Sequence, residues 1–274
     1  MSAAAQVVTL RVLRSTLAIA AVVLGVVPAL AQRTPEPRPD TAEFLPHYTF
    51  NLAGAALSSD DQAFSWDTHF GGEVEIVDYV IGRAAFLADY QAVLGSEFRP
   101  FDPNQGNYLL DLSGSLRAPA GVELVGVFHH VSRHLSDRYK RFPIAWNMLQ
   151  ARALRRFTAG AGTTIDVRAD VGKVVAHTYV DYEWEGDLEF VVRHPVTPHV
   201  GLYAKALGQT MGVDPLVKSR TRQDGGRIEG GFRFTGGKQG SLELYVGYEK
   251  MIDASLIDFQ PRQWAFAGFR IVGN

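Results

Sequence analysis

The chain contains no cysteine, and this absence excludes several classes of protein at once. Without thiols there is no disulfide framework, no cysteine-ligated zinc or iron–sulfur site and no thiol nucleophile. An excess of positive charge is missing too, because 27 lysines and arginines stand against 29 aspartates and glutamates. Nucleic-acid affinity rests on neutralising phosphates, so we expect no nucleic-acid partner. We also expect no cofactor and no metal ion, since the sequence has no phosphate-cradling glycine loop, dinucleotide fingerprint or H-E-x-x-H motif.

Long apolar runs are absent after the N-terminus, which excludes a helical membrane protein. Residues 1–31 are different. Arg11 and Arg14 precede an uncharged apolar stretch over 16–30, which ends in the small-x-small pattern Ala29-Leu30-Ala31. These features predict a signal peptide that is cleaved after Ala31. We therefore expect an exported protein.

Residues 32–47 are rich in proline, with four prolines in the segment QRTPEPRPDTAEFLPH. Such a composition favours an extended tether over a packed domain. We expect this tether to lie in the periplasm and residues 48–274 to form a single domain.

From residue 48 onward the apolar residues recur with a period of two, which is typical of β-strands. In 240–250, for example, Leu242, Leu244 and Val246 alternate with polar residues such as Glu243. The segment 147–157 has a composition that favours a helix, and we assign it to a strand from its context. The predicted strands are 48–58, 64–76, 82–92, 105–117, 121–131, 147–158, 163–183, 187–194, 198–210, 226–235, 240–250 and 263–272. Because 163–183 is unusually long, ten or fourteen strands also fit the pattern.

Charges of both signs occupy the polar face of these strands. Asp111, Asp166 and Glu243 lie on it together with Arg168 and Arg227. In an outer-membrane barrel the polar face encloses the lumen, so charges of opposite sign should pair there. An ordinary solvated antiparallel sheet would show the same alternation, with its polar face in water.

The lengths of the connections separate these two interpretations. Counted from the first strand, the even-numbered connections are all short, whereas four of the odd-numbered ones are long: 93–104, 132–146, 211–225 and 251–262. Short periplasmic turns that alternate with longer outer loops are typical of outer-membrane barrels. The fold class we predict is therefore all-β: a closed antiparallel transmembrane β-barrel of about twelve strands in a bacterial outer membrane.

The last strand, QWAFAGFRIVGN, carries aromatic residues at alternate positions. In this it resembles the C-terminal signature strand of Gram-negative outer-membrane proteins, although it ends in Gly273-Asn274 rather than in phenylalanine. The resemblance implies the barrel assembly machinery as a partner.

One cluster of residues could carry chemistry. Residues 128–138 read FHHVSRHLSDR, at the end of the fifth predicted strand. Because alternate residues share a face, His130, Ser132 and His134 should line one side of that strand. His130 could take a proton from Ser132 while Asp137 orients the imidazole, as in a serine hydrolase.

His130-Val131-Ser132 resembles the His-x-Ser element that outer-membrane phospholipase A and the lipid A deacylase carry on a barrel strand facing the outer leaflet. The resemblance implies a serine-type lipid esterase, with His130 and Ser132 at the lipid boundary. Arg133 follows Ser132 where those enzymes carry asparagine. The longer string His130-x-Ser132-x-His134-Leu135-x-Asp137 resembles an uncharacterised family of bacterial barrel proteins and implies no activity.

Two other interpretations of the cluster stay open. His129, His130, His134 and Asp137 could bind a metal, but strand geometry divides the imidazoles between two faces. The residues could instead hydrogen-bond a loop to the barrel rim.

Basic residues in two predicted outer loops suggest contact with anionic lipids or lipopolysaccharide phosphates. They are Arg133, Arg138, Lys140 and Arg141 in one loop, and Lys218, Arg220 and Arg222 in the other. Solvated loops would have the same composition.

Three functions remain open from the sequence. The first is a non-enzymatic barrel that binds or passes a small solute or has a structural role. The second is an outer-leaflet lipid hydrolase that uses Ser132 and His130, and the third is a soluble secreted or periplasmic β-barrel binding protein.

Overall fold

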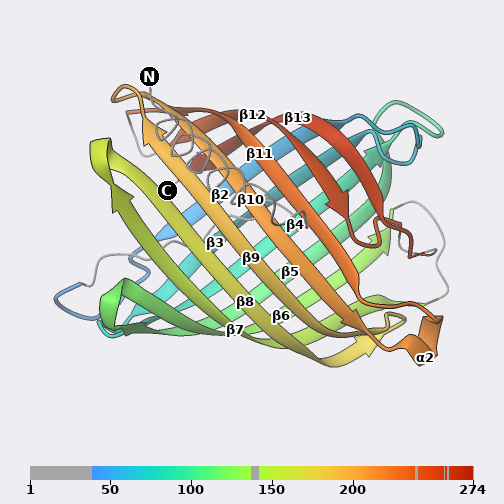
Figure 1. Ribbon diagram of the computed structural model, residues 1–274, viewed down its shortest axis with the longest axis horizontal. Coiled ribbons are helices and arrows are strands. Elements are labelled where there is room, and N and C mark those ends of the chain that lie inside the picture. The colour runs from blue at the N-terminus through green and yellow to red at the C-terminus, as the bar shows by residue number, and fades with distance from the viewer. Residues whose placement is uncertain (1–38, 137–141, 238–239, 256, 258, 274) are drawn as a thin grey trace, which may run out of the picture.

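A computed structural model describes residues 39–136, 142–237, 240–255, 257 and 259–273, and nearly all of them belong to a single antiparallel sheet (Figure 1). Twelve long strands form the wall, and a two-residue strand, β1 (Glu43–Phe44), lies outside it. The wall strands are β2 (Tyr48–Leu57), β3 (Trp66–Asp78), β4 (Arg83–Gly95), β5 (Asp102–Ala118), β6 (Val122–Leu135), β7 (Ile144–Ala159), β8 (Thr163–Thr178), β9 (Tyr182–Pro195), β10 (Val200–Val213), β11 (Gln223–Thr235), β12 (Ser241–Met251) and β13 (Arg262–Gly273).

The sheet closes on itself. Each long strand pairs with its neighbours in the chain, and β13 pairs with β2, for example through Ala267 and Ala56. Closure leaves no unpaired edge in the wall, which is the condition for a sheet to span a membrane. The predicted closed barrel of twelve strands is therefore confirmed.

The two ends of the barrel differ (Figure 1). The connections 79–82, 119–121, 160–162, 196–199 and 236–240 are short, and they lie at the end that also holds the C-terminus. Longer connections, among them 214–222 with the short helix α2 (Pro215–Lys218), lie at the other end. We call these the short-turn end and the long-loop end. The alternation inferred from the sequence is present in the structure.

The predicted strand 163–183 is correct to Thr178 and wrong in its last five residues, where the chain turns and a new strand begins. Strand β8 ends at Thr178 and β9 begins at Tyr182, so the predicted connection 184–186 lies inside β9. Tyr179, between the two strands, has a positive φ of 69°, a left-handed conformation that reverses the chain direction. The sequence did not reveal this turn because residues 179–181 contain neither glycine nor proline, the strongest turn signals.

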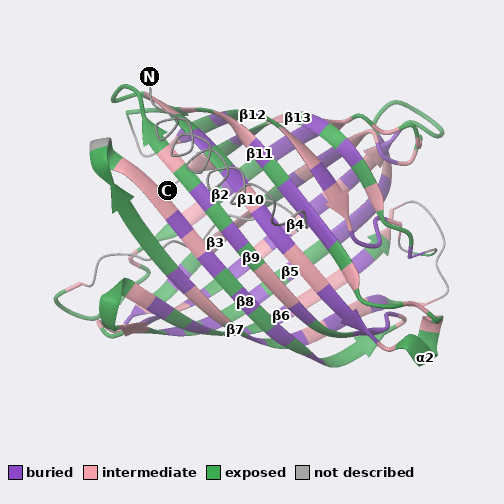
Figure 2. Ribbon diagram, in the orientation of Figure 1, coloured by how far each residue is buried: buried purple, intermediate pink, exposed green. Residues whose placement is uncertain are grey.

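The alternating faces place charge inside the barrel and apolar side chains outside. On β12, Glu243 is 3% exposed, whereas its neighbours Leu244 and Val246 are 45% and 65% exposed. The same banding repeats along the other strands (Figure 2). An apolar outer surface over a charged interior is the arrangement of a membrane barrel. It contradicts the soluble alternative, in which the charged face would have met water.

Charges of opposite sign pair throughout the interior. Arg83, 2% exposed, donates to Glu75 at 3.1 Å and to Glu123 at 2.8 Å. Elsewhere Arg270 donates to Glu229 and Glu243 at 2.8 and 2.7 Å. Because the interior excludes most water, each of these charges needs a partner.

The predicted signal peptide and most of the predicted tether lie outside the described residues. The end of the tether is described, and it is not free of the barrel: Glu43 and Phe44 of β1 pair with Asp78 and Val77 of β3. This short pairing attaches the tether to the short-turn end. In the described part of the chain, no helix is long and apolar enough to cross a membrane.

Replacing Arg83 with alanine should lower the free energy of unfolding by about 3–5 kcal/mol, because Glu75 and Glu123 would stay buried after losing the cation that both of them bind. Urea unfolding of the barrel in lipid vesicles measures this change. The matched control is Arg155→Ala on the outer surface, where only a cation–π contact with Phe157 is lost and the expected change is below about 1 kcal/mol. Equal losses in both variants would contradict a stabilising role for the internal ion pairs.

Candidate functional site

The histidine cluster lies on β6 near the long-loop end, and its members divide between the two faces of the wall. His130, Ser132 and His134 share the outward face with Leu124 and Phe128, which are 52% and 45% exposed. The expected common face is therefore present. Their strand neighbours point inward.

A hydrogen bond links His130 to the next strand. In the register of the sheet, His130 lies opposite Asn147 on β7, and its Nδ1 is 2.7 Å from Asn147 Oδ1. The register between β7 and β8 shifts directly after Asn147, as it does at a β-bulge. Bulges re-aim side chains and are frequent beside active sites.

The hydroxyl of Ser132 lies beside a second imidazole. Its Oγ is 2.8 Å from Nε2 of His134, two residues further along the same face. The ring of Tyr108, opposite Ser132 on β5, meets the ring of His134 edge-on with centroids 5.5 Å apart. Aromatic side chains thus border the polar cluster toward the long-loop end.

The bond to Asn147 determines what His130 can do chemically. An amide oxygen only accepts hydrogen bonds, so with this amide orientation Nδ1 of His130 carries the proton and Nε2 is left as a base. In serine hydrolases a carboxylate plays this orienting part. Ser132, next on the same face, supplies the hydroxyl that such a base would activate. The arrangement therefore places a hydroxyl, an imidazole and an amide on one patch of the outer wall.

Asp137, the orienting residue expected from the sequence, lies outside the described residues, as do Arg138, Lys140 and Arg141. Asn147 was not anticipated. It follows Ser132 by fifteen positions across a connection whose length does not fix the register of β7 against β6. The only signal in the sequence was an amide on the apolar face of a strand.

The metal-binding alternative receives no support from the geometry of the described residues. His129 points into the barrel, where its Nδ1 lies 2.6 Å from Asp111, whereas His130 points outward. In the described part of the chain, no group of three or more histidine, aspartate and glutamate side chains could hold a metal ion.

Four of the basic residues predicted to contact lipid are described by the structure, and they lie in different environments. Strand β6 extends through Leu135, so Arg133 belongs to the wall and not to a loop. Its side chain points inward, is 7% exposed, and donates to the carbonyl oxygens of Asp253 and Ala254. This position inside the barrel does not suit contact with lipid.

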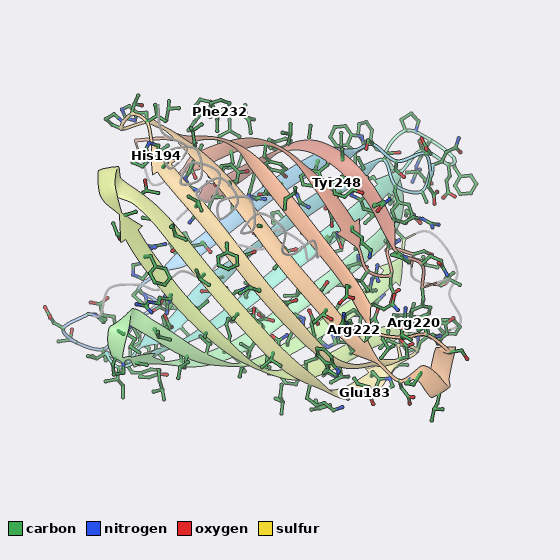
Figure 3. The ribbon with its side chains drawn as sticks, in the orientation of Figure 1. Glu183, His194, Arg220, Arg222, Phe232 and Tyr248 are labelled. Carbon is green, nitrogen blue, oxygen red and sulfur yellow. The ribbon has the colours of Figure 1, made fainter. Side chains whose placement is uncertain are left out.

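Arg220 and Arg222 do lie at the long-loop end, close to α2 (Figure 3). Arg222 is exposed and pairs with Asp224, whereas Arg220 donates to Asp181 and Asp253 and so joins two connections at this end. Burial opposes the charge of Arg220, but these hydrogen bonds raise its pKa above the ordinary value.

Lys218 rests over the aromatic rings of Tyr179 and Phe259, at 4.4 and 4.1 Å from their centroids. Cation–π contacts of this kind hold the long-loop end together. Whether Lys218 or Arg222 contacts anionic lipid stays a prediction.

Comparison with solved structures identifies the fold. Outer-membrane phospholipase A from Escherichia coli superposes with a TM-score of 0.52 at 15% identity, over 82% of this chain and 92% of that one. A form of the same enzyme in which an active-site asparagine is replaced gives 0.52 at 15% identity, over 89% and 95%. An outer-membrane channel from Pseudomonas putida gives 0.51 at 14% identity, over 90% and 99%. The chain has the fold of bacterial outer-membrane β-barrels. Neither a protein-family model nor a curated sequence matches it.

The tautomer of His130 is directly measurable. We expect ¹⁵N-histidine NMR of the barrel in detergent to show that the neutral ring of His130 carries its proton on Nδ1 and not on Nε2, because Asn147 Oδ1 accepts from Nδ1. In Asn147→Ala the two tautomers should mix. A protonated Nε2 in the wild type would mean that the amide is turned the other way and that His130 is not poised as a base.

Proposed function

We propose that this protein resides in the bacterial outer membrane and hydrolyses ester bonds of lipids in the outer leaflet. Ser132 is the nucleophile, His130 the general base and Asn147 the residue that orients the base. The observation that carries the proposal is the hydrogen bond of 2.7 Å between His130 and Asn147 on the lipid-facing side of the wall.

The position of the three residues along the barrel supports the choice of leaflet. Outer-membrane barrels keep short turns in the periplasm and longer loops outside the cell. By this rule the long-loop end faces outward. His130 and Ser132 lie in the second half of β6, which ends at this side, and this position supports a depth in the outer leaflet.

The polar side chains on this surface need an explanation, because exposing a polar group to hydrocarbon costs free energy. His130 has Leu110 and Phe128 near it on the outer wall, and both are exposed apolar residues. A lipid acyl chain can lie along such residues while its ester group reaches the hydroxyl. The apolar surroundings thus favour a lipid substrate over a soluble one.

The chemistry follows the acyl-transfer scheme of serine hydrolases. Ser132 Oγ attacks the ester carbonyl as its proton moves to Nε2 of His130. The tetrahedral intermediate then expels the alcohol, which takes that proton and leaves an acylated Ser132. Water, activated by the same base, attacks the acyl group and releases the fatty acid. Asn147 holds the imidazole in the orientation that both half-reactions need.

In the resting structure the Ser132 hydroxyl contacts His134 rather than His130. The two imidazoles flank Ser132 on one face, so rotation about the serine Cα–Cβ bond redirects the hydroxyl from one to the other. His130 is assigned as the base because it has an orienting partner on the adjacent strand. The fold neighbours include a phospholipase whose active site contains an asparagine, which agrees with the part given to Asn147.

Ser132→Ala should lower the lipid-releasing activity by about a thousandfold or more, because the covalent step would have no nucleophile. Release of fatty acid from phospholipid in mixed micelles measures this, with the boiling-dependent gel shift of the barrel as the control for folding. Ser113→Ala, a change on the inner face of β5, is the matched variant and should keep full activity. Full activity of Ser132→Ala would exclude the proposed nucleophile.

Asn147→Ala should lower kcat by at least about tenfold with little change in KM, since a misoriented base loses part of the roughly 10²–10⁴-fold that general base catalysis supplies. His130→Ala should be at least as damaging, whereas His134→Ala should keep most of the activity. The reverse order, with His134 essential and His130 dispensable, would contradict the assignment of the base.

A further inference from the structure

A cavity of about 120 Å³ lies in the lumen, between the charged middle of the barrel and the long-loop end. The polarity of its lining differs from one part to another. Apolar and aromatic side chains, including Trp146, Tyr182 and Met211, form one part, and polar and charged side chains form the other. The cavity is on the opposite side of the wall from Ser132, so the proposed hydrolase chemistry does not use it.

Several buried polar atoms of the lining have no hydrogen-bond partner. They are the donors Nε1 of Trp146 and Nε of Arg168, and the side-chain oxygens Oε1 of Gln150, Oδ1 of Asn107 and Oδ1 of Asp187. Trp146, Gln150 and Asn107 are each only 7% exposed. Buried polar groups are normally paired, so unpaired ones around one cavity indicate a ligand or ordered water. Three of the five atoms are acceptors, so a ligand that pairs with them must supply mainly donors.

The charges of the lining also favour a ligand that donates hydrogen bonds. Each arginine of the lining has a nearby acceptor: Arg152 donates to Asp170, Arg168 forms an ion pair with the same carboxylate, and Arg133 donates to backbone carbonyls. Glu185 and Asp187 differ, because no ion pair joins either of them to a lysine or arginine of the described residues.

Glu185 accepts a hydrogen bond of 2.6 Å from Gln209, and beyond this the two acids contact each other. The nearby cation is Arg168, which already forms an ion pair with Asp170, so negative charge is in excess around the two buried carboxyl groups. A cation is the ligand that would compensate it.

We propose that this cavity binds a small organic cation with a primary ammonium group and a short apolar tail. The ammonium group has three donors, which match Asp187 Oδ1, Gln150 Oε1 and the carboxylate of Glu185. The tail lies against Met211 and the ring of Trp146.

The aromatic pair in the lining favours the same class of ligand. Trp146 and Tyr182 meet edge-on with ring centroids 5.0 Å apart, and aromatic faces attract ammonium groups. A solute with only acceptor groups would leave the orphan oxygens unpaired, so an anion or an ether does not fit.

Titration with n-butylammonium tests the proposal, with Trp146 as the reporter. We expect a saturable change in the tryptophan fluorescence of the folded barrel, absent in Trp146→Phe, and binding at least about tenfold weaker for butan-1-ol, which carries no charge. Asp187→Asn should weaken the binding of n-butylammonium by at least about tenfold. The matched control is Glu183→Gln on the same strand, whose side chain is exposed outside the barrel (Figure 3), and it should bind like the wild type.

Leu109→Phe provides a second variant that leaves the charges unchanged. Leu109 lines the cavity, so a larger side chain should fill it and abolish the signal, while the boiling-dependent gel shift confirms that the barrel is folded. Ser132→Ala should bind n-butylammonium normally, which separates this site from the proposed hydrolase. The absence of saturable binding would mean that the cavity holds water only. Equal binding of the alcohol, or normal binding by Asp187→Asn, would also overturn the proposal.

Discussion

Charge pairing inside a closed sheet is the constraint on which this structure depends. A barrel that turns apolar side chains to lipid must turn the alternate ones inward, and here those are arginines and acids. Arg83 between Glu75 and Glu123, and Arg270 between Glu229 and Glu243, show that the partners come from different strands. Each such pair depends on the register of the strands that carry it. A slip by one residue would turn these charges toward lipid, so the pairs and the apolar exterior specify the register together.

The same constraint identifies the candidate site. Where the outer wall must be apolar, a cluster of imidazole, hydroxyl and amide groups is an exception to the pattern that specifies the fold, and such exceptions concentrate at functional sites. His130, Ser132 and Asn147 form this exception, and the sheet holds them on adjacent strands with a defined register. The inner face of β6 shows the contrast. There His129 and Arg133 are fully engaged with neighbours inside the barrel, and their part is structural.

Much of the fold could be predicted from the sequence, because a period of two and the spacing of turns are local properties. The strands around 110, 168 and 245 follow from alternation alone. The turn at 179–181 could not be predicted in this way, since it contains neither glycine nor proline and its mark is the positive φ of Tyr179, a property of the backbone. Arg133 was expected in an outer loop, and its position in the wall was not predicted, because its hydrogen bond to Asp253 joins residues far apart in the chain.

Only part of the candidate site could be predicted from the sequence, for a related reason. His130 and Ser132 share a strand, so their common face could be inferred from spacing. Asn147 reaches His130 through the pairing of β6 with β7 and beside a bulge in β8, and neither feature is encoded in a local pattern. The unpaired acids Glu185 and Asp187 likewise become visible only when the cations around them are found to have other partners.

The most direct test of the account is covalent labelling of the folded barrel in outer-membrane vesicles with a long-chain alkyl fluorophosphonate, followed by mass spectrometry of the peptides. The account predicts modification at Ser132, greatly slowed in His130→Ala and absent once the barrel is unfolded. Labelling spread over several serines, or a Ser132 that stays unmodified in the folded protein, would contradict it.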